Sequence, residues 1–108
     1  MSRFIIKGGL GRLFRYDLKE GATTVGREPD NDLVLPNSSV SRTHARLLRT
    51  GDEISIEDAG SSHGLFINSE KLPRTSLASG DIVEIGQFTL IPIADDQTQF
   101  EGRYVEYL

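Results

Sequence analysis

Apolar and polar residues alternate along this chain in short runs separated by turn-forming residues, and no stretch shows the spacing of an amphipathic helix. The alternation is clearest at residues 54–58, Ile-Ser-Ile-Glu-Asp, which follow a turn at residues 50–53. Residues 43–49 have some helical propensity, but the turn and the alternation after them favour a β-hairpin.

Other short apolar runs are bounded by Gly, Pro, Asn and Asp, the residues that favour turns. A loop rich in such residues, 28–32, precedes the apolar run 33–36. Many short strands with regular turns predict an antiparallel β-sandwich or barrel, with solvent-facing loops at one end that suit a binding site. The further strands expected from these runs lie at residues 4–6, 13–18, 23–25, 65–67, 82–85 and 88–91.

Composition fits one domain of ordinary size. The chain has 108 residues, of which 37% are hydrophobic and 26% charged, values typical of a soluble globular protein. No apolar run is long enough to cross a bilayer, and the one at residues 4–6 is too short for a signal peptide. The absence of cysteine excludes disulfides and thiolate metal sites. We expect a cytoplasmic monomer without a cofactor.

The net charge of -4 disfavours broad binding to nucleic acid. Local positive potential is still available, because Arg42, Arg46 and Arg49 follow one another closely. This distribution suits a small anionic partner group better than an extended polyanion.

Candidate chemistry is concentrated in polar clusters at predicted turns. Arginine, serine hydroxyls and backbone amides freed by glycine hold a phosphoryl oxygen without reacting with it. No nucleophile stands beside a suitable base, so the pattern points to a reader of phosphorylated peptide rather than an enzyme. The clusters are Gly26-Arg27, Ser41-Arg42-Thr43-His44, and Ser61-Ser62-His63-Gly64 leading to Asn68.

Other readings of these residues fail on context. Residues 60–64 match the Gly-x-Ser-x-Gly pattern of hydrolases, but a strand rather than a helix is expected after them. Two histidines with scattered carboxylates give no metal-ligand spacing. Residues 30–32, Asp-Asn-Asp, lack the glycine and distal glutamate of a calcium loop and fit a loop bonded to its own backbone.

Three segments resemble, in order, the motifs of the forkhead-associated (FHA) family. Residues 24–35 resemble its opening strand and Gly-Arg loop, and residues 40–45 its Ser-Arg-x-His segment. Residues 58–68 resemble its Ser-x-Asn-Gly-Thr-x-Val-Asn segment. The resemblance covers residues 4–93 and implies a domain at residues 1–94, followed by a polar tail or linker at residues 95–108. It also implies a β-sandwich of about eleven strands whose loops at one end bind phosphothreonine peptides.

The resemblance also assigns roles to individual residues. Arg27, Ser41 and Ser62 would contact the phosphate, and Arg42 would hold the phosphate or the peptide backbone. Each of two assignments has a plainer alternative. Ser41 would then be a turn serine bonded to its own backbone, and Arg42 would be a solvated surface side chain. The residues expected to brace the loops are Gly26, His44, Gly64 and Asn68, the last by bonding to backbone groups.

Two positions depart from the family pattern. His63 stands where the family usually has an Asn that holds the peptide main chain, and an imidazole cannot copy the paired geometry of a carboxamide. Leu65 stands at a position usually filled by Thr. The expected function is binding of a protein phosphorylated on threonine by a Ser/Thr kinase, with Arg42 and His63 holding or reading the peptide. The alternative is a phosphate-independent assembly module of the same fold.

The tail suggests a separate hypothesis, in which Thr98 is phosphorylated and the domain binds its own tail or a neighbouring copy. An inert linker threonine is the simpler interpretation.

Overall fold

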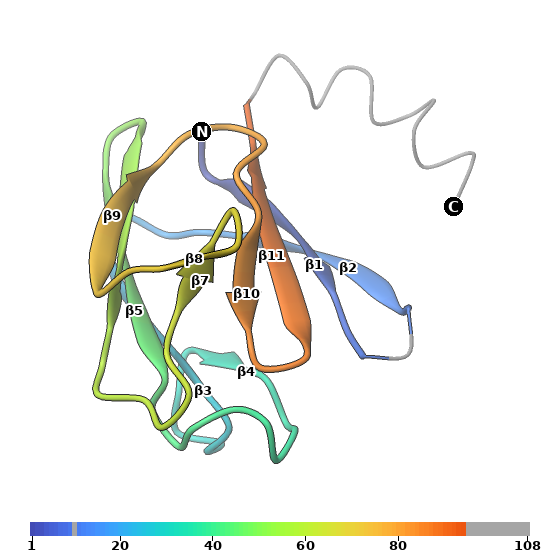
Figure 1. The fold of residues 1–108 in the computed structure, drawn as a ribbon. Coiled ribbons are helices and arrows are strands. Elements are labelled where there is room, and N and C mark those ends of the chain that lie inside the picture. The colour runs from blue at the N-terminus through green and yellow to red at the C-terminus, as the bar shows by residue number, and fades with distance from the viewer. Residues whose placement is uncertain (10, 95–108) are drawn as a thin grey trace.

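The computed structural model describes residues 1–9 and 11–94, in which β-strands are the regular secondary structure. The strands form two sheets that pack face to face (Figure 1). In spatial order the first sheet contains β2 (Leu13–Asp17), β1 (Arg3–Lys7), β11 (Phe88–Ile93), β10 (Val83–Ile85), β7 (Phe66–Ile67) and β8 (Glu70–Lys71). The second contains β4 (Leu33–Val34), β3 (Gly21–Gly26), β5 (Ala45–Thr50), β6 (Glu53–Asp58) and β9 (Arg74–Leu77).

This architecture confirms the expected all-β sandwich of about eleven strands. Adjacent strands pair antiparallel, except that β3 and β4 run parallel. The parallel pair arises because the chain leaves β3, loops through residues 27–32 and re-enters the sheet edge in the same direction. The loop at residues 27–32 therefore begins and ends beside neighbouring strands, β3 and β4.

The hydrophobic core lies between the two sheets and follows from the period of two along each strand. In β11, Phe88, Leu90 and Pro92 are buried while the residues between them are only half-buried. In β5, Ala45 and Leu47 point inward in the same way. The buried apolar residues form a single cluster: Phe4, Ile6, Leu18, Val25, Leu33, Leu35, Val40, Ala45, Leu47, Ile54, Ile56, Leu65, Ile67, Leu77, Val83, Ile85, Phe88 and Leu90.

The predicted hairpin is present as β5 and β6, paired in register from Ala45 opposite Asp58 to Thr50 opposite Glu53. The turn between them uses Gly51 at a φ of 63°, a left-handed conformation that glycine adopts without strain. Because β5 also pairs with β3, the helical propensity of residues 43–49 is overridden by hydrogen bonds on both sides of the strand.

The sequence pattern did not indicate β8 or β9. Each is a strand at the edge of its sheet, and of their residues only Leu77 is buried. Strands with so little buried surface carry a weak apolar signal. Asn68 and Ser69, with φ of 51° and 71°, form the turn into β8. The Asn68 carboxamide accepts a hydrogen bond from the Ile82 amide at 2.9 Å, which ties this turn to the start of β10.

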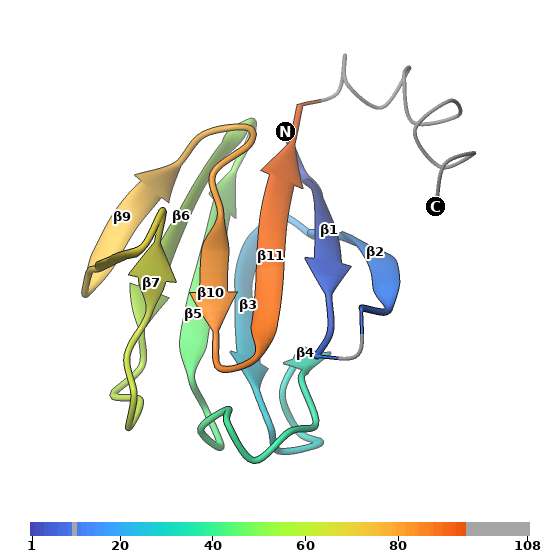
Figure 2. The ribbon, with the colours of Figure 1, turned by 45° about the vertical axis from the view of Figure 1, so that its right-hand side comes forward.

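The loops that carry the polar clusters gather at one end of the sandwich. The loops 27–32, 35–44 and 59–65 lie opposite the N-terminus and the end of β11 (Figure 2). The tail at residues 95–108, with Thr98, lies outside the described residues. In the described part of the chain, no helix has the length and apolar character needed to span a membrane.

Truncation of a core residue tests the packing. Leu47 is fully buried in β5, so Leu47→Ala is expected to lower the free energy of unfolding by about 2–5 kcal/mol through lost burial and a residual cavity. Thr50→Ala, an exposed change on the same strand, is expected to stay within about 0.5 kcal/mol. Urea unfolding followed by circular dichroism measures both, and equal effects of the two changes would contradict this account of the core.

Candidate functional site

Backbone hydrogen bonds bring the polar clusters together. The Arg27 amide donates to the Ser41 carbonyl at 3.0 Å, and the Ser62 amide donates to the Ser41 hydroxyl oxygen at 3.0 Å. Ser41 is therefore the point at which the loops after β3, before β5 and after β6 meet. Arg27, Ser41 and Ser62, which are far apart in the sequence, become neighbours in space.

Gly26 is required by the close approach of two backbone segments. A Cβ atom at this position would lie 2.2 Å from the Arg42 carbonyl oxygen and 2.7 Å from the Asn31 Nδ2 atom. Real Cβ atoms do not come this near to backbone atoms, so any side chain would push residues 41–42 away from β3. The glycine thereby sets the distance between Arg27 and Ser41.

His44 is fully buried and links two of the loops. Its Nδ1 atom accepts a hydrogen bond from the Ser41 amide at 3.0 Å. The ring is then the tautomer with its proton on Nε2, and it donates that proton to the Gly64 carbonyl at 2.7 Å. The imidazole has no remaining donor or acceptor for a ligand, so its role here is architectural.

Asn31 is a second buried polar residue, 8% exposed, that sequence reasoning did not single out. Its Nδ2 group donates to the Glu28 carbonyl at 2.9 Å, as expected for a loop bonded to its own backbone. The same group also donates to the Arg42 carbonyl at 2.7 Å, across to another loop. The sequence signal for this role was the position of Asn31 among turn-forming residues just before an apolar run.

Asp58 fixes the loop after β6 and was likewise missed. Its Oδ2 atom accepts the Gly60 and Ser61 amides at 3.0 and 3.1 Å, and its Oδ1 atom accepts the Ser61 hydroxyl. The Ser61 oxygen in turn accepts the Gly64 amide at 2.9 Å. The available signal was an aspartate two residues before a glycine, which is typical of such turns. Ser61 is thus committed to its own loop, whereas Ser62 is exposed.

Donors remain at the surface where the loops meet. The Nε atom of Arg27 donates to the Val40 carbonyl at 3.0 Å, which orients the guanidinium. Within the described residues, its two terminal amino groups have no partner. Ser41 uses its oxygen as an acceptor, so its hydroxyl proton is free to be donated outward. A planar fork of donors beside a hydroxyl can hold an anion with several oxygens.

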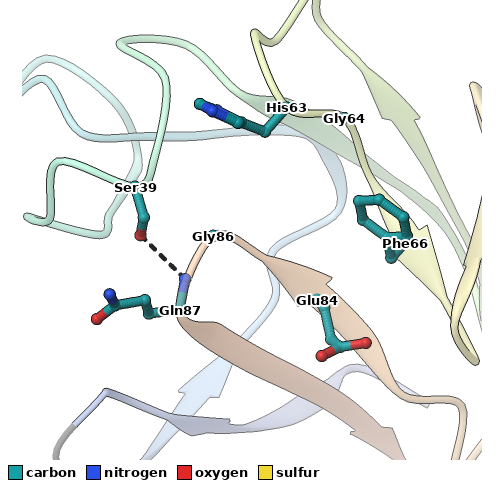
Figure 3. A pocket seen from close by; sticks show the side chains of 7 residues that line it. All are labelled: Ser39, His63, Gly64, Phe66, Glu84, Gly86 and Gln87. Atoms are coloured by element: carbon teal, nitrogen blue, oxygen red, sulfur yellow. Dashed lines mark hydrogen bonds between the residues drawn. The ribbon is translucent and has the colours of Figure 1, made fainter.

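Arg42 and His63, the other predicted peptide contacts, are exposed at the margin of this group. The Nε atom of Arg42 lies 3.6 Å from a Glu28 carboxylate oxygen, and the Arg42 side chain is 79% exposed. Such an ion pair is screened by water and leaves the arginine available. His63 lines an open hollow beside the loops (Figure 3). Leu65, the other departure from the family pattern, is fully buried in the core.

The carboxylate of Asp32 braces the loop after β3. Its Oδ2 atom accepts the Thr24 amide at 3.0 Å, and Lys19 lies 3.6 Å from Oδ1. The Thr24 amide, aided by Lys19, lowers the pKa of Asp32 below its ordinary value. Within residues 1–9 and 11–94, no group of three or more His, Asp or Glu side chains is placed to hold a metal ion.

Removal of the His44 imidazole is expected to destabilise the domain by about 2–4 kcal/mol, because it leaves the Ser41 amide and the Gly64 carbonyl without partners. The other histidine of the chain provides a matched control. His63→Ala, at an exposed position, is expected to change the free energy of unfolding by less than about 0.5 kcal/mol. Chemical denaturation of His44→Ala and His63→Ala measures both, and a neutral His44→Ala would refute the bridging role.

The Asp32 pKa predicts a dependence of stability on pH. Since the folded-state pKa lies below the unfolded one, ionised Asp32 stabilises the fold at neutral pH. This contribution is lost as the pH falls below about 4 and passes through the folded-state pKa. Asp32→Asn is therefore expected to be less stable than the wild type at pH 7, with the difference shrinking in acid. Thermal unfolding from pH 7 to 2, with Asp30→Asn as control, tests this, and a gap that is constant with pH would contradict it.

Comparisons with known proteins agree with this geometry. A model of the FHA domain matches residues 23–86, more than half of the chain. The chain is 38% identical over 96 residues to the glycogen accumulation regulator GarA of Mycolicibacterium smegmatis, a match that covers 85% of this chain and 61% of GarA. The chain spans about three-fifths of the length of the curated relatives it matches first.

Solved structures show the same fold. One, from work on phosphothreonine-dependent FHA domain interactions, has a TM-score of 0.75 and 30% identity, covering 84% of this chain and 94% of its own. Mycobacterium tuberculosis EmbR, solved with a low-affinity phosphopeptide, has a TM-score of 0.68 and 31% identity, covering 87% of this chain and 26% of EmbR. On its sequence motifs, its sandwich and these matches, the chain belongs to the FHA domain family.

Proposed function

We propose that this FHA domain is a phosphothreonine-dependent protein-binding module, which docks an extended peptide across the loops 26–32, 37–44 and 60–64. The observation that carries the proposal is the pairing of Arg27 with Ser41. The guanidinium is held by the carbonyl of Val40, the neighbour of Ser41, and among the described residues its terminal amino groups have no partner. The Ser41 hydroxyl accepts the Ser62 amide and retains a donatable proton.

In this proposal Arg27, Ser41 and Ser62 hold the phosphate. Arg27 supplies charge and bidentate hydrogen bonds, and Ser41 supplies a hydroxyl whose oxygen is already oriented by the Ser62 amide. Arg42 and His63, both exposed at the rim, contact the peptide on either side of the phosphothreonine. Gly26, His44 and Gly64 shape the binding loops without touching the ligand. Asn68, which was expected to brace the same loops, instead bonds to Ile82 and Asp81 and holds the β7–β8 turn against the start of β10.

Relatives support this assignment. EmbR was solved with a phosphopeptide, and another structural neighbour comes from work on phosphothreonine-dependent interactions. GarA is described as a regulator of glycogen accumulation. We further propose that the partner of this domain is a cytoplasmic protein phosphorylated by a Ser/Thr kinase, and that the domain acts as a monomer.

The proposal assigns no catalytic activity, and the placement of the serines supports this. Ser62, the serine of the Gly-x-Ser-x-Gly pattern, lies between strands β6 and β7, whereas the hydrolase motif needs a helix after it. The buried His44 uses both ring nitrogens in hydrogen bonds and cannot serve as a base. The net charge of -4 also argues against a nucleic-acid partner.

A phosphopeptide titration tests the proposal. A phosphothreonine peptide library is expected to bind the wild type, with weaker binding of phosphoserine peptides by about fivefold because the γ-methyl group is lost. Unphosphorylated peptides are expected not to bind. Arg27→Ala should weaken binding at least about thirtyfold, since it removes a charged partner of the phosphate. Fluorescence polarisation with labelled peptides gives these affinities.

Arg74→Ala, which removes an exposed arginine on the edge strand β9, serves as the charge-matched control and should leave affinity unchanged. Equal binding of phosphorylated and unphosphorylated peptides would refute phosphate dependence. A partner that still binds Arg27→Ala would instead favour the phosphate-independent assembly module, with the exposed His63 loop as its contact surface.

A further inference from the structure

An open hollow of about 490 Å³ adjoins the proposed phosphate site. Three of its lining residues belong to the binding loops, since Ser39 precedes Ser41 by two positions and His63 and Gly64 follow Ser62 directly. The rest of its wall comes from β7, β10 and the turn between β10 and β11 (Figure 3). The lining residues are Ser39, His63, Gly64, Phe66, Glu84, Gly86 and Gln87.

The wall of this hollow is built in advance of any ligand. The Ser39 hydroxyl oxygen accepts the Gln87 amide at 3.0 Å, which joins the loop before β5 to the β10–β11 turn. Gly86 allows this contact, because a Cβ atom there would lie 2.5 Å from the Ser39 Oγ atom and 2.7 Å from its carbonyl oxygen. The hollow therefore keeps a fixed position relative to Ser41.

Two side chains give the hollow its chemical character. Phe66 and Glu84 are direct cross-strand partners of β7 and β10, so they lie on the same face of the sheet. Phe66 is half-buried and presents an apolar ring, whereas the carboxylate of Glu84 is exposed. Among the described residues, Glu84 has neither an ion pair nor a hydrogen bond through its side chain.

Two lysines share this row of the sheet, each two strands from Glu84. Lys7 lies beyond Thr89 on one side, and on the other side Phe66 pairs with Lys71. The aliphatic stem of Lys71 lies against Gly64, where an added Cβ atom would meet Lys71 Cε at 2.5 Å. Neither Lys7 nor Lys71 is part of the hollow's lining, so the charged side chain that faces the cavity beside Phe66 is the Glu84 carboxylate.

Resting on the proposed function, we propose that this hollow binds an arginine or lysine side chain of the phosphopeptide and so selects basic residues flanking the phosphothreonine. The apolar stem lies against the Phe66 ring and the cationic head pairs with Glu84. Arginine fits best, because its planar guanidinium stacks on an aromatic ring and still offers donors to a carboxylate. An extended peptide advances about 3.3 Å per residue, which places this residue within a few positions of the phosphothreonine.

A positional scan tests this inference. Phosphothreonine peptides with random flanks are prepared with Arg, Lys, Ala or Glu fixed at one flanking position at a time. The wild type is expected to prefer Arg and Lys over Ala by about three- to fivefold at one position, and over Glu by more. Glu84→Gln should abolish that preference, and Glu84→Lys should turn it into a preference for Glu.

Glu53→Lys is the matched control, because it makes the same change of charge at an exposed position in the other sheet and should keep the wild-type preference. Phosphothreonine-dependent binding without a basic preference would overturn the inference and leave the proposed function standing. A basic preference that survives in Glu84→Gln would overturn the assignment to Glu84. Failure of every phosphothreonine peptide to bind would overturn the proposed function, and the inference with it.

Discussion

The buried imidazole of His44 is the interaction on which the binding end of this domain depends. One ring nitrogen accepts the Ser41 amide and the other donates to the Gly64 carbonyl, so one side chain fixes two loops from different parts of the sequence. Backbone groups at the end of a sandwich have no strand partner and would otherwise need water. A fully buried ring excludes water from this junction, and the bonds it makes in a low-dielectric setting are costly to break.

Asn31 and Asp58 extend the same principle. Asn31 holds the Arg42 carbonyl close to β3, and Asp58 gathers the amides of Gly60 and Ser61. These side chains satisfy the loops internally, so the donors of Arg27 and Ser41 that remain are directed at solvent. The resulting division is simple: side chains beneath the surface hold the loops, and side chains at the surface are free for a ligand. Rigid loops also lower the entropic cost of binding, because less of the chain must be ordered when the ligand arrives.

The two departures from the family pattern have different physical meanings. Leu65 replaces a polar residue with one that is fully buried, so the change is absorbed by the core and adds apolar burial beneath the loop. His63 is exposed at the rim of the hollow that contains Phe66 and Glu84, so this change alters the surface that a ligand meets. The residues proposed to hold phosphate and those proposed to read the flanking sequence thus lie in adjacent but separate places.

Local sequence was sufficient for much of this picture. Alternation marked the hairpin of β5 and β6, since one buried face leaves a period of two, and glycine, arginine and serine at turns marked the candidate phosphate site. The edge strands β8 and β9 gave no such signal, because a strand with almost no buried face has no pattern to read. The Asp58 side chain bonds only within its own turn and could have been found from local sequence. The bond from Asn31 to the Arg42 carbonyl, and the hollow between Phe66 and Glu84, depend on which distant segments meet. Contacts between segments that are far apart in the sequence are set by how the strands pair and the two sheets pack, and no short stretch of sequence encodes them.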